Sequence, residues 1–272
     1  MKRLINQTPA PVTRALLGLL PFVLLVIAYV LASEARLAEN PADKLLPSFT
    51  QIGDAIYRMA FEPSKRTGEY LLWADTASSL SRLALGVLIA AAIGLVLGLF
   101  TGALPLVSAA ASPLLTVVSL IPPLAILPVL FIIFGLGEVS KVALIAIGIT
   151  PYIARDLQRR TREIPSEQLV KAQTLGAGTS QIICRVLLPQ LMPRLIDAVR
   201  LSLGAGWLFL IAAEAIAATD GLGYRIFLVR RYMAMDVILP YVAWITLLAF
   251  LIDLLLAGLS RRLYPWQSKG AW

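Results

Sequence analysis

The fold is set by one polar stretch in an otherwise apolar chain, RDLQRRTREIPSEQLVKAQTLGAGTSQIICRVLLPQLMPR (residues 155–194). It contains seven Lys and Arg residues, whereas the runs on either side of it are apolar. Basic residues between membrane helices concentrate on the cytoplasmic side of a membrane protein. The stretch therefore predicts a cytoplasmic segment that connects two membrane spans.

Within this segment, the pattern predicts two short helices joined at a glycine turn. Ser166 is expected to cap the first helix, and Gly176-Ala-Gly178 is expected to end it in a tight, left-handed turn at Gly176. Thr179 is expected to cap the second helix, which continues to Leu188 and ends before Pro189. Each helix carries an apolar face, which consists of Leu169, Ala172 and Leu175 on the first helix and of Ile182, Ile183, Val186 and Leu187 on the second.

The stretch LVKAQTLGAGTSQIICRVLLP (residues 169–189) resembles the EAA loop of binding-protein-dependent ABC importer permeases, which reads Glu-Ala-Ala-x3-Gly-x9-Ile-x-Leu-Pro. Val170 and Lys171 replace the first Glu and Ala of that pattern, and Glu167 offers a carboxylate one turn earlier. In such permeases the loop docks into a groove of the ATPase subunit. The resemblance implies that the residues contacting the ATPase are Glu167, Val170, Lys171, Ala172, Leu175, Gly176, Ala177, Val186, Leu188 and Pro189.

Three further blocks extend the resemblance over roughly residues 75–265, namely PPLAILP (122–128), FGLGEVSK (134–141) and AEAIAATDGLG (213–223). Together the blocks look like the nitrate/sulfonate/taurine/bicarbonate branch of these permeases. The resemblance implies a bacterial inner-membrane subunit that forms a homodimer. It also implies ATPase subunits that bind the ATP, a periplasmic solute-binding protein, and a small solute of this branch or another small nitrogen compound.

The composition predicts an integral membrane protein. The 272 residues are 58% hydrophobic, with a mean hydropathy of +0.81, well above the values of soluble domains. The net charge is +8, but the basic residues flank apolar runs, which indicates membrane topology and lipid contact instead of nucleic-acid binding. A single cysteine, Cys184, excludes an internal disulfide, and the chain has no histidine to ligate a metal. No Gly-x4-Gly-Lys-Ser/Thr loop occurs, so we expect no catalytic site, metal or cofactor in this chain.

Apolar runs predict an all-α, polytopic helix bundle with about six transmembrane helices and both termini in the cytoplasm. The expected spans are residues 15–32, 75–102, 104–134, 142–157, 195–218 and 236–259. The expected organisation is a cytoplasmic tail (1–14), the first span (15–32), a periplasmic connector (33–74), a permease core (75–260) whose cytoplasmic coupling loop is residues 158–193, and a cytoplasmic tail (261–272). A cleaved signal peptide is the alternative for residues 15–32, but we expect a retained helix because more spans follow.

The connector contains one amphipathic segment, residues 46–61. Phe49, Ile52 and Ile56 recur at helical spacing on one side of it. This pattern predicts a helix that lies on the outer membrane surface. A solvated connector is an equally good interpretation.

Two features of the second span predict how it packs. Arg82 would be costly at membrane depth unless it reaches the surface or pairs with a carboxylate. Small residues recur at every fourth position and predict a ridge where another helix approaches closely, and they are Gly86, Ala90, Gly94, Gly98 and Gly102.

Two elements are candidates for the translocation pathway or its gate. Pro122-Pro123 should break the third span, as should Pro128, and such a break either faces a cavity or only shapes the bundle. Glu214 either lines the pathway or makes a buried hydrogen bond that holds the turn at Gly221–Gly223. Asp253, near the inner end of the last span, is expected to pair with a basic residue.

Another class of function remains open at this point. A secondary transporter or channel subunit that works without ATP would also be an apolar helix bundle. No pair of matching broken helices or chain of intramembrane acids supports ion coupling. Neighbouring genes for an ATPase and a secreted binding protein would favour the importer.

Overall fold

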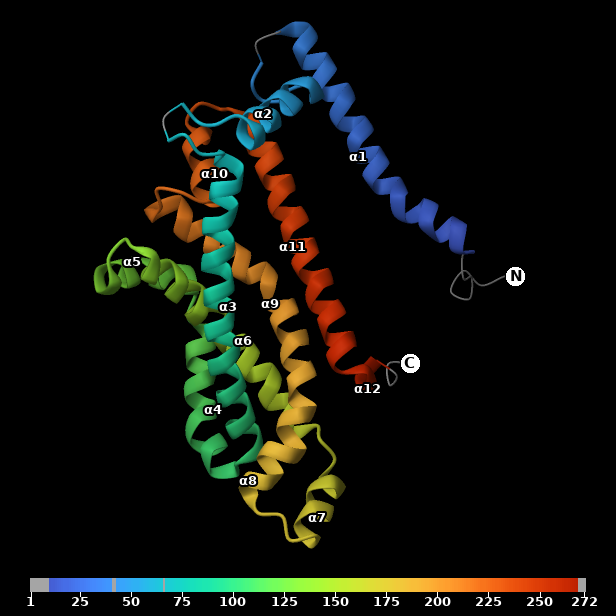
Figure 1. Cartoon of the computed structure of the whole chain (residues 1–272), viewed down its shortest axis with the longest axis vertical. Helices are drawn as coiled ribbons and strands as arrows, with labels where there is room; N and C mark the ends of the chain where they lie inside the picture. The colour runs from blue at the N-terminus through green and yellow to red at the C-terminus, as the bar shows by residue number, and fades with distance from the viewer. Residues whose placement is uncertain (1–9, 41–42, 66, 269–272) are drawn as a thin grey trace.

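A computed structural model describes residues 10–40, 43–65 and 67–268, and its regular elements there are helices (Figure 1). The outer parts of both predicted tails, residues 1–9 and 269–272, lie outside the described residues. The elements are α1 (Pro11–Glu39), α2 (Phe49–Phe61), α3 (Leu71–Ala103), α4 (Pro105–Leu120), α5 (Pro123–Phe134), α6 (Glu138–Arg162), α7 (Ser166–Thr174), α8 (Thr179–Ile182), the π-helix η2 (Ile183–Leu187), α9 (Leu188–Ala217), α10 (Leu222–Arg230), α11 (Met235–Leu263) and α12 (Pro265–Ser268).

The closest helix pair is α3 and α6, and the predicted small-residue ridge forms their seam. A Cβ added at Gly98 would lie 2.5 Å from the Cβ of Leu157 and 2.8 Å from the carbonyl oxygen of Ala154. An added Cβ at Gly86 or Gly94 would meet an isoleucine of α6 at 2.7 Å. Only hydrogen fits at these positions, so the two backbones touch along most of their length.

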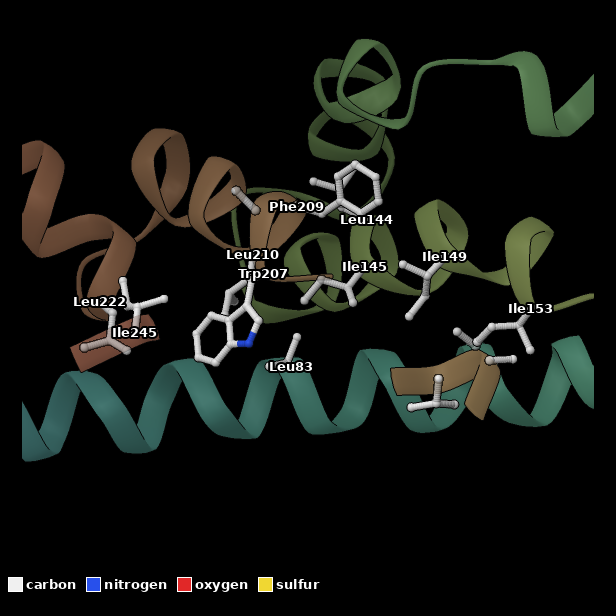
Figure 2. Close-up of a cluster of buried hydrophobic side chains, with 14 of the residues drawn as sticks. Leu83, Leu144, Ile145, Ile149, Ile153, Trp207, Phe209, Leu210, Leu222 and Ile245 are labelled. Carbon is white, nitrogen blue, oxygen red and sulfur yellow. The ribbon is translucent and has the colours of Figure 1, made fainter. Parts of the chain in front are cut away.

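The third member of the core is α9, which packs against both α3 and α6. Large apolar side chains of the three helices interlock with residues of α10 and α11, as Figure 2 shows. Phe209 of α9 fills the space above Gly148 of α6, where an added Cβ would lie 2.5 Å from its ring. The labelled core residues are Leu83, Leu144, Ile145, Ile149, Ile153, Trp207, Phe209, Leu210, Leu222 and Ile245.

The predicted break at Pro122-Pro123 is confirmed. Helices α4 and α5 meet there at an angle of 95°, and α5 extends away from the bundle in Figure 1. The predicted break at Pro128 is wrong, because α5 continues through this residue. Pro128 is the sixth residue of a helix that starts at Pro123, so it removes one backbone hydrogen bond, to the carbonyl of Leu124, without ending the helix.

Among the residues that the structure describes, four helices are long and apolar enough to cross a membrane, and the bent pair of α4 and α5 makes five if it counts as one span. These four are α1, α3, the segment Thr179–Ala217 and α11. Helix α6, the expected fourth span, has 25 residues, but its uncharged stretch covers only residues 142–154. The all-helical bundle is therefore confirmed, while the count of six spans stays a prediction.

The segment after the glycine turn differs from its prediction. We expected a short helix that ends before Pro189 and a separate span from Leu195, but α8, η2 and α9 form one continuous helix, Thr179–Ala217. Proline clashes with the carbonyl group four residues earlier in an α-helix. Here the Leu188 N–H bonds to the oxygen of Ile183, five residues earlier, and this wider turn accommodates Pro189 without a break.

Helices α1 and α2 lie at the edge of the bundle, and α1 leans away from it in Figure 1. The Ser48 hydroxyl and the Gln51 side chain form a capping box that starts α2, which confirms the helix predicted there. The Tyr29 hydroxyl of α1 donates to the carbonyl of Pro47 at 2.7 Å, and the Tyr29 ring packs on Phe49. Helix α2 thus joins the C-terminal end of α1 to the bundle.

The seam predicts different outcomes for two Gly→Ala changes. Gly98→Ala forces α3 and α6 apart, whereas Gly204→Ala in α9 adds a methyl group where no atom lies within 4 Å. Both changes gain the same helix propensity, so their difference reports packing alone. We expect Gly98→Ala to be less stable than Gly204→Ala by about 1–3 kcal/mol, measured by unfolding of the purified chain in detergent. Equal stabilities would contradict the seam.

Candidate functional site

Two groups of polar residues lie at opposite ends of the bundle. The coupling loop, with α7 and α8, forms one end in Figure 1, and the start of α3, α2 and α10 lie at the other. The helix Thr179–Ala217 has 39 residues, so it spans roughly 58 Å between the two ends. This length exceeds the roughly 30 Å hydrocarbon core of a bilayer.

The glycine turn of the coupling loop has the predicted left-handed geometry. Gly176 has a φ of +83°, and its N–H bonds to the oxygen of Gln173 at 2.9 Å. The N–H of Ala177 bonds to the oxygen of Ala172 at 3.0 Å. These two bonds form a Schellman motif, which ends α7 and fixes the direction of the chain toward α8.

The expected caps of the two helices differ from the structure. Pro165, not Ser166, is the N-cap of α7, and Ser166 is the first helical residue. Gly178, not Thr179, is the N-cap of α8, and the Gln181 side chain accepts the Gly178 N–H at 3.0 Å. This bond is the half of a capping box that the side chain at the third helical position provides, and Gly178 has no side chain to supply the other half.

The predicted ATPase-contacting residues divide into two groups. Leu175 is 81% exposed and Val170 is 55% exposed, so the loop presents apolar side chains outward. Leu175 therefore does not share the half-buried position of Leu169 and Ala172, as the spacing predicted, because it is the C-cap of α7. Exposed residues are Glu167, Val170, Lys171, Leu175, Gly176 and Pro189, and half-buried residues are Ala172, Ala177, Val186 and Leu188.

The first helix of the loop is fastened to the long helix by side chains. The Gln190 amide of α9 donates to Gln168 of α7 at 3.0 Å and to the carbonyl oxygen of Val186 at 2.9 Å. Leu169 and Ile164 also pack against the apolar core. Helix α7 is therefore connected to Thr179–Ala217 through both covalent and packed contacts.

At the opposite end lies an ionic cluster, defined as Arg82, Glu138, Lys141, Glu214 and Asp220. Arg82 is 4% exposed, and its guanidinium makes five hydrogen bonds, to both oxygens of Glu138, to Glu214, and to the side chain and carbonyl of Asp220. Lys141 adds a bond of 2.7 Å to Glu138. Of the two alternatives expected for Arg82, the structure shows pairing with carboxylates, and the cluster joins α3, α6, α9 and the turn before α10.

Glu214 is fully buried inside this cluster. Its carboxylate accepts bonds from Arg82 at 2.8 Å, from the Ser79 hydroxyl at 2.8 Å and from the Gly223 N–H at 2.8 Å. A Cβ added at Gly221 would lie 2.5 Å from its Oε1 atom, so the turn must carry a glycine there. This geometry agrees with the alternative in which Glu214 holds the glycine turn, while its role in a pathway or gate stays a prediction.

Asp220 follows α9 and lies at the solvent-facing side of the cluster. Burial alone would raise the pKa of its carboxyl group, but hydrogen bonds from Ser78 and Arg82 hold that pKa below its usual range. Asp220 therefore stays charged at neutral pH and balances part of the Arg82 charge.

Further ion pairs connect the helices. Asp75 of α3 accepts bonds from Arg225 at 2.8 Å, from the Gly221 N–H at 3.0 Å and from the Tyr241 hydroxyl at 3.1 Å. Asp253 of α11 pairs with Arg200 of α9 at 2.8 Å, which confirms the expected basic partner. The sequence analysis did not identify Asp75 or Glu138, although each stands at the polar start of a long helix.

The predicted pathway residues Pro122 and Pro123 lie elsewhere. They form the bend between α4 and α5, away from the ionic cluster. A small space lined by Pro123, Ile126 and Gly148 separates the bend from α6. The structure does not bring these prolines together with Glu214.

Comparison with known proteins supports the family resemblance. The family model of the binding-protein-dependent transport system inner membrane component matches residues 71–269. The chain is 37% identical to the taurine transport system permease protein TauC of Escherichia coli K12, over 73% of this chain and 72% of that protein. It is 30% identical to the putative aliphatic sulfonates transport permease protein SsuC of Bacillus subtilis 168, over 70% and 69% of the two chains.

A third relative matches more of the chain. The nitrate import permease protein NrtB of Leptolyngbya laminosa is 27% identical over 91% of this chain and 87% of its own length. Among solved structures, an inward-facing form of the MetNI methionine ABC transporter gives a TM-score of 0.64 at 22% identity, covering 73% of this chain and 98% of that one. This likeness shows a shared fold.

The ionic cluster predicts a large cost for removing its central charge. Arg82→Met leaves Glu214 buried without its cation, and we expect a loss of about 3–5 kcal/mol in the free energy of unfolding. Arg58→Met, which removes an exposed pair with Asp236, should cost at most about 1 kcal/mol. Unfolding of the purified variants in detergent measures both values.

A double variant tests the cause of this loss. Arg82→Met combined with Glu214→Gln removes both charges and keeps an acceptor for the Gly223 N–H. It should be more stable than Arg82→Met alone. A double variant that is no better than the single one would show that the buried carboxylate is not responsible.

Proposed function

Because this chain belongs to the family of binding-protein-dependent transport system inner membrane components, the permease subunits of ABC importers, we propose that it couples the movement of a separate ATPase to solute translocation. The observation that supports this role is the unbroken helix Thr179–Ala217, which connects the coupling loop to the ionic cluster. Because members of this family are permeases of ABC importers, the alternative function, an ATP-independent transporter or channel, no longer applies.

The proposed assembly has two copies of this permease, two ATPase subunits that bind ATP, and a periplasmic solute-binding protein. The exposed apolar residues Val170 and Leu175 offer the ATPase a contact surface, with Glu167 and Lys171 on the same helix. Burial of two such side chains supplies a few kcal/mol, on the order of what is needed to shift an equilibrium between two conformations.

The proposed mechanism follows from the connections between elements. The ATPase dimer displaces α7 when it closes, and the Gln190–Gln168 bond and the Schellman turn carry this displacement into the long helix. Helices α3 and α6 move as one body because their seam leaves no space between them. The tilt of α9 against that body then opens one side of the pathway and closes the other.

We place the coupling loop, residues 158–193, and both chain ends in the cytoplasm, and the ionic cluster and α2 on the periplasmic side. The seven basic residues of the segment 155–194 support this orientation. Helices α1 and α11 run in directions that point both chain ends toward the side of α7 in Figure 1. The location is the bacterial inner membrane.

The proposed solute is a small compound of the taurine, sulfonate or nitrate kind. The names of the relatives support this choice, since two of them are permeases for taurine and aliphatic sulfonates and one imports nitrate. Selection among these solutes belongs to the binding protein, so its binding to a panel of sulfonates and nitrate identifies the substrate.

The natural cysteine tests the orientation. Cys184 is exposed in the coupling loop, so a membrane-impermeant maleimide should label it in inverted vesicles and not in intact spheroplasts. In a Cys184→Ser background, Tyr232→Cys, exposed after α10, should show the reverse pattern. Labelling of Cys184 from outside would place the coupling loop on the wrong side for an ATPase.

The turn at Gly176 tests the coupling. Gly176→Val forces a β-branched residue into a left-handed conformation, at a cost of about 1–2 kcal/mol, whereas Gly176→Asn is tolerated there. No atom lies within 4 Å of an added Cβ, so strain alone separates the two variants. We expect at least fivefold less taurine uptake per ATP hydrolysed for Gly176→Val in the reconstituted transporter, and nearly normal coupling for Gly176→Asn.

Two results would contradict the coupling role. One is normal uptake per ATP in Gly176→Val, and the other is an equal loss in Gly176→Asn. Co-purification of the ATPase with each variant separates failed docking from failed transmission. Absence of taurine uptake in the natural protein, with binding-protein-stimulated ATP hydrolysis intact, would reject the solute and not the coupling.

A further inference from the structure

A basic cavity lies at the base of the coupling loop. Its volume is about 920 Å³, and it lies between the end of α6, the start of α9, and the end of α11 with α12. Four arginines from these three elements line it, together with two acids and two aromatic residues: Arg160, Arg194, Arg200, Arg261, Glu163, Asp197, Tyr264 and Trp266. The ATP-coupling mechanism uses none of these side chains.

Two of the four arginines are neutralised within the protein. Arg200 is paired with Asp253 at 2.8 Å and lies 3.9 Å from Asp197. Arg160 lies 3.4 Å from Glu163 and 3.7 Å from Asp156, although its buried Nε atom has no hydrogen-bond partner. These carboxylates are therefore already occupied by cations.

The other two arginines are not neutralised. Within the described part of the chain, Arg194 forms no ion pair, and Arg261 makes only a bond of 3.3 Å to the carbonyl of Ala257, one turn earlier on its own helix. Among the described residues, neither guanidinium therefore lies within ion-pair distance of a carboxylate, although Asp197 also lines the cavity. A guanidinium fork matches the oxygens of a phosphate group better than it matches any uncharged ligand.

The surroundings favour a phosphate that belongs to a lipid. Tyr264 and Trp266 stack edge to face at 5.3 Å beside the cavity, and these residue types concentrate at the level of lipid headgroups. One to two turns before the cavity, α11 exposes the apolar side chains of Phe250 and Leu254 on the face that carries Ala257 and Arg261. Acyl chains attached to a headgroup in the cavity would lie along this apolar surface, which a free phosphate would leave bare.

We propose that this cavity binds the phosphate headgroup of an anionic glycerophospholipid through Arg194 and Arg261. Basic pockets between transmembrane helices on the cytoplasmic side suit such headgroups. The assignment to the inner leaflet rests on the orientation proposed above, whereas headgroup binding does not depend on it. Ile164 and Pro165, which also line the cavity, lead directly into α7, so the lipid lies against the base of the coupling loop.

The test is a titration of the full-length chain in neutral detergent with short-chain phosphatidylglycerol, followed by the midpoint of thermal unfolding. Phosphatidylcholine of equal chain length and inorganic phosphate are the comparison ligands. The test variant is Arg194→Gln with Arg261→Gln. The matched control is Arg231→Gln with Arg262→Gln, which removes the same charge at two exposed arginines outside the cavity.

We expect phosphatidylglycerol to raise the unfolding midpoint of the natural protein and of the control, with at least tenfold weaker apparent affinity for the test variant. Replacement of both arginines by lysine keeps the two positive charges, so this variant should bind phosphatidylglycerol more tightly than the glutamine variant does. Unfolding midpoints without lipid show whether each variant is folded.

Three outcomes would overturn the proposal. One is equal affinity of phosphatidylglycerol for the test and control variants. Another is an equal, arginine-dependent shift with inorganic phosphate, which would identify a free anion as the ligand. The third is a response that appears only after the ATPase is added, which would make the cavity a protein-docking surface.

Discussion

The structure depends on the burial of one positive charge. Arg82 lies in an apolar helix, where an uncompensated guanidinium would be costly, and three carboxylates from different parts of the chain approach it. Because all five of its N–H groups are used, the positions of α3, α6, α9 and the turn before α10 are fixed relative to one another. The glycines at 221 and 223 follow from this constraint, since the turn presses directly on Glu214.

The bundle therefore combines one closely packed helix pair with one long helix that the ionic cluster holds at one end. The seam between α3 and α6 excludes side chains, so these two helices have no room to slide apart or reorganise. Helix α9 contacts the pair through larger side chains such as Phe209. The two ends of the long helix differ, because one leads into the proposed surface for a partner protein and the other ends in a fully bonded ionic cluster. The proposed transport cycle uses this difference.

Local patterns predicted the elements more reliably than their connections. The four-residue spacing of small residues predicted the α3–α6 seam, and Gly176 predicted a left-handed turn, because both are decided by backbone sterics within a few residues. Arg82 required a carboxylate, but Glu138 and Asp220 lie 56 and 138 residues away in sequence, and no local pattern relates them. Pro189 predicted a helix end, since nothing nearby indicates that a π-turn would accommodate it. The cavity at the base of the coupling loop was invisible in sequence because three distant segments line it.

The isolation of α1 explains its composition. None of its most apolar 18-residue stretch is buried within this chain, and its residues are bulky, with a single glycine, Gly18. Helix α3 is equally apolar but has four glycines, because its surface must fit another helix. During synthesis α1 is made before the rest of the bundle, so lipid must be its first solvent. The composition of α1 therefore suits contact with lipid, whereas that of α3 suits close contact with another helix.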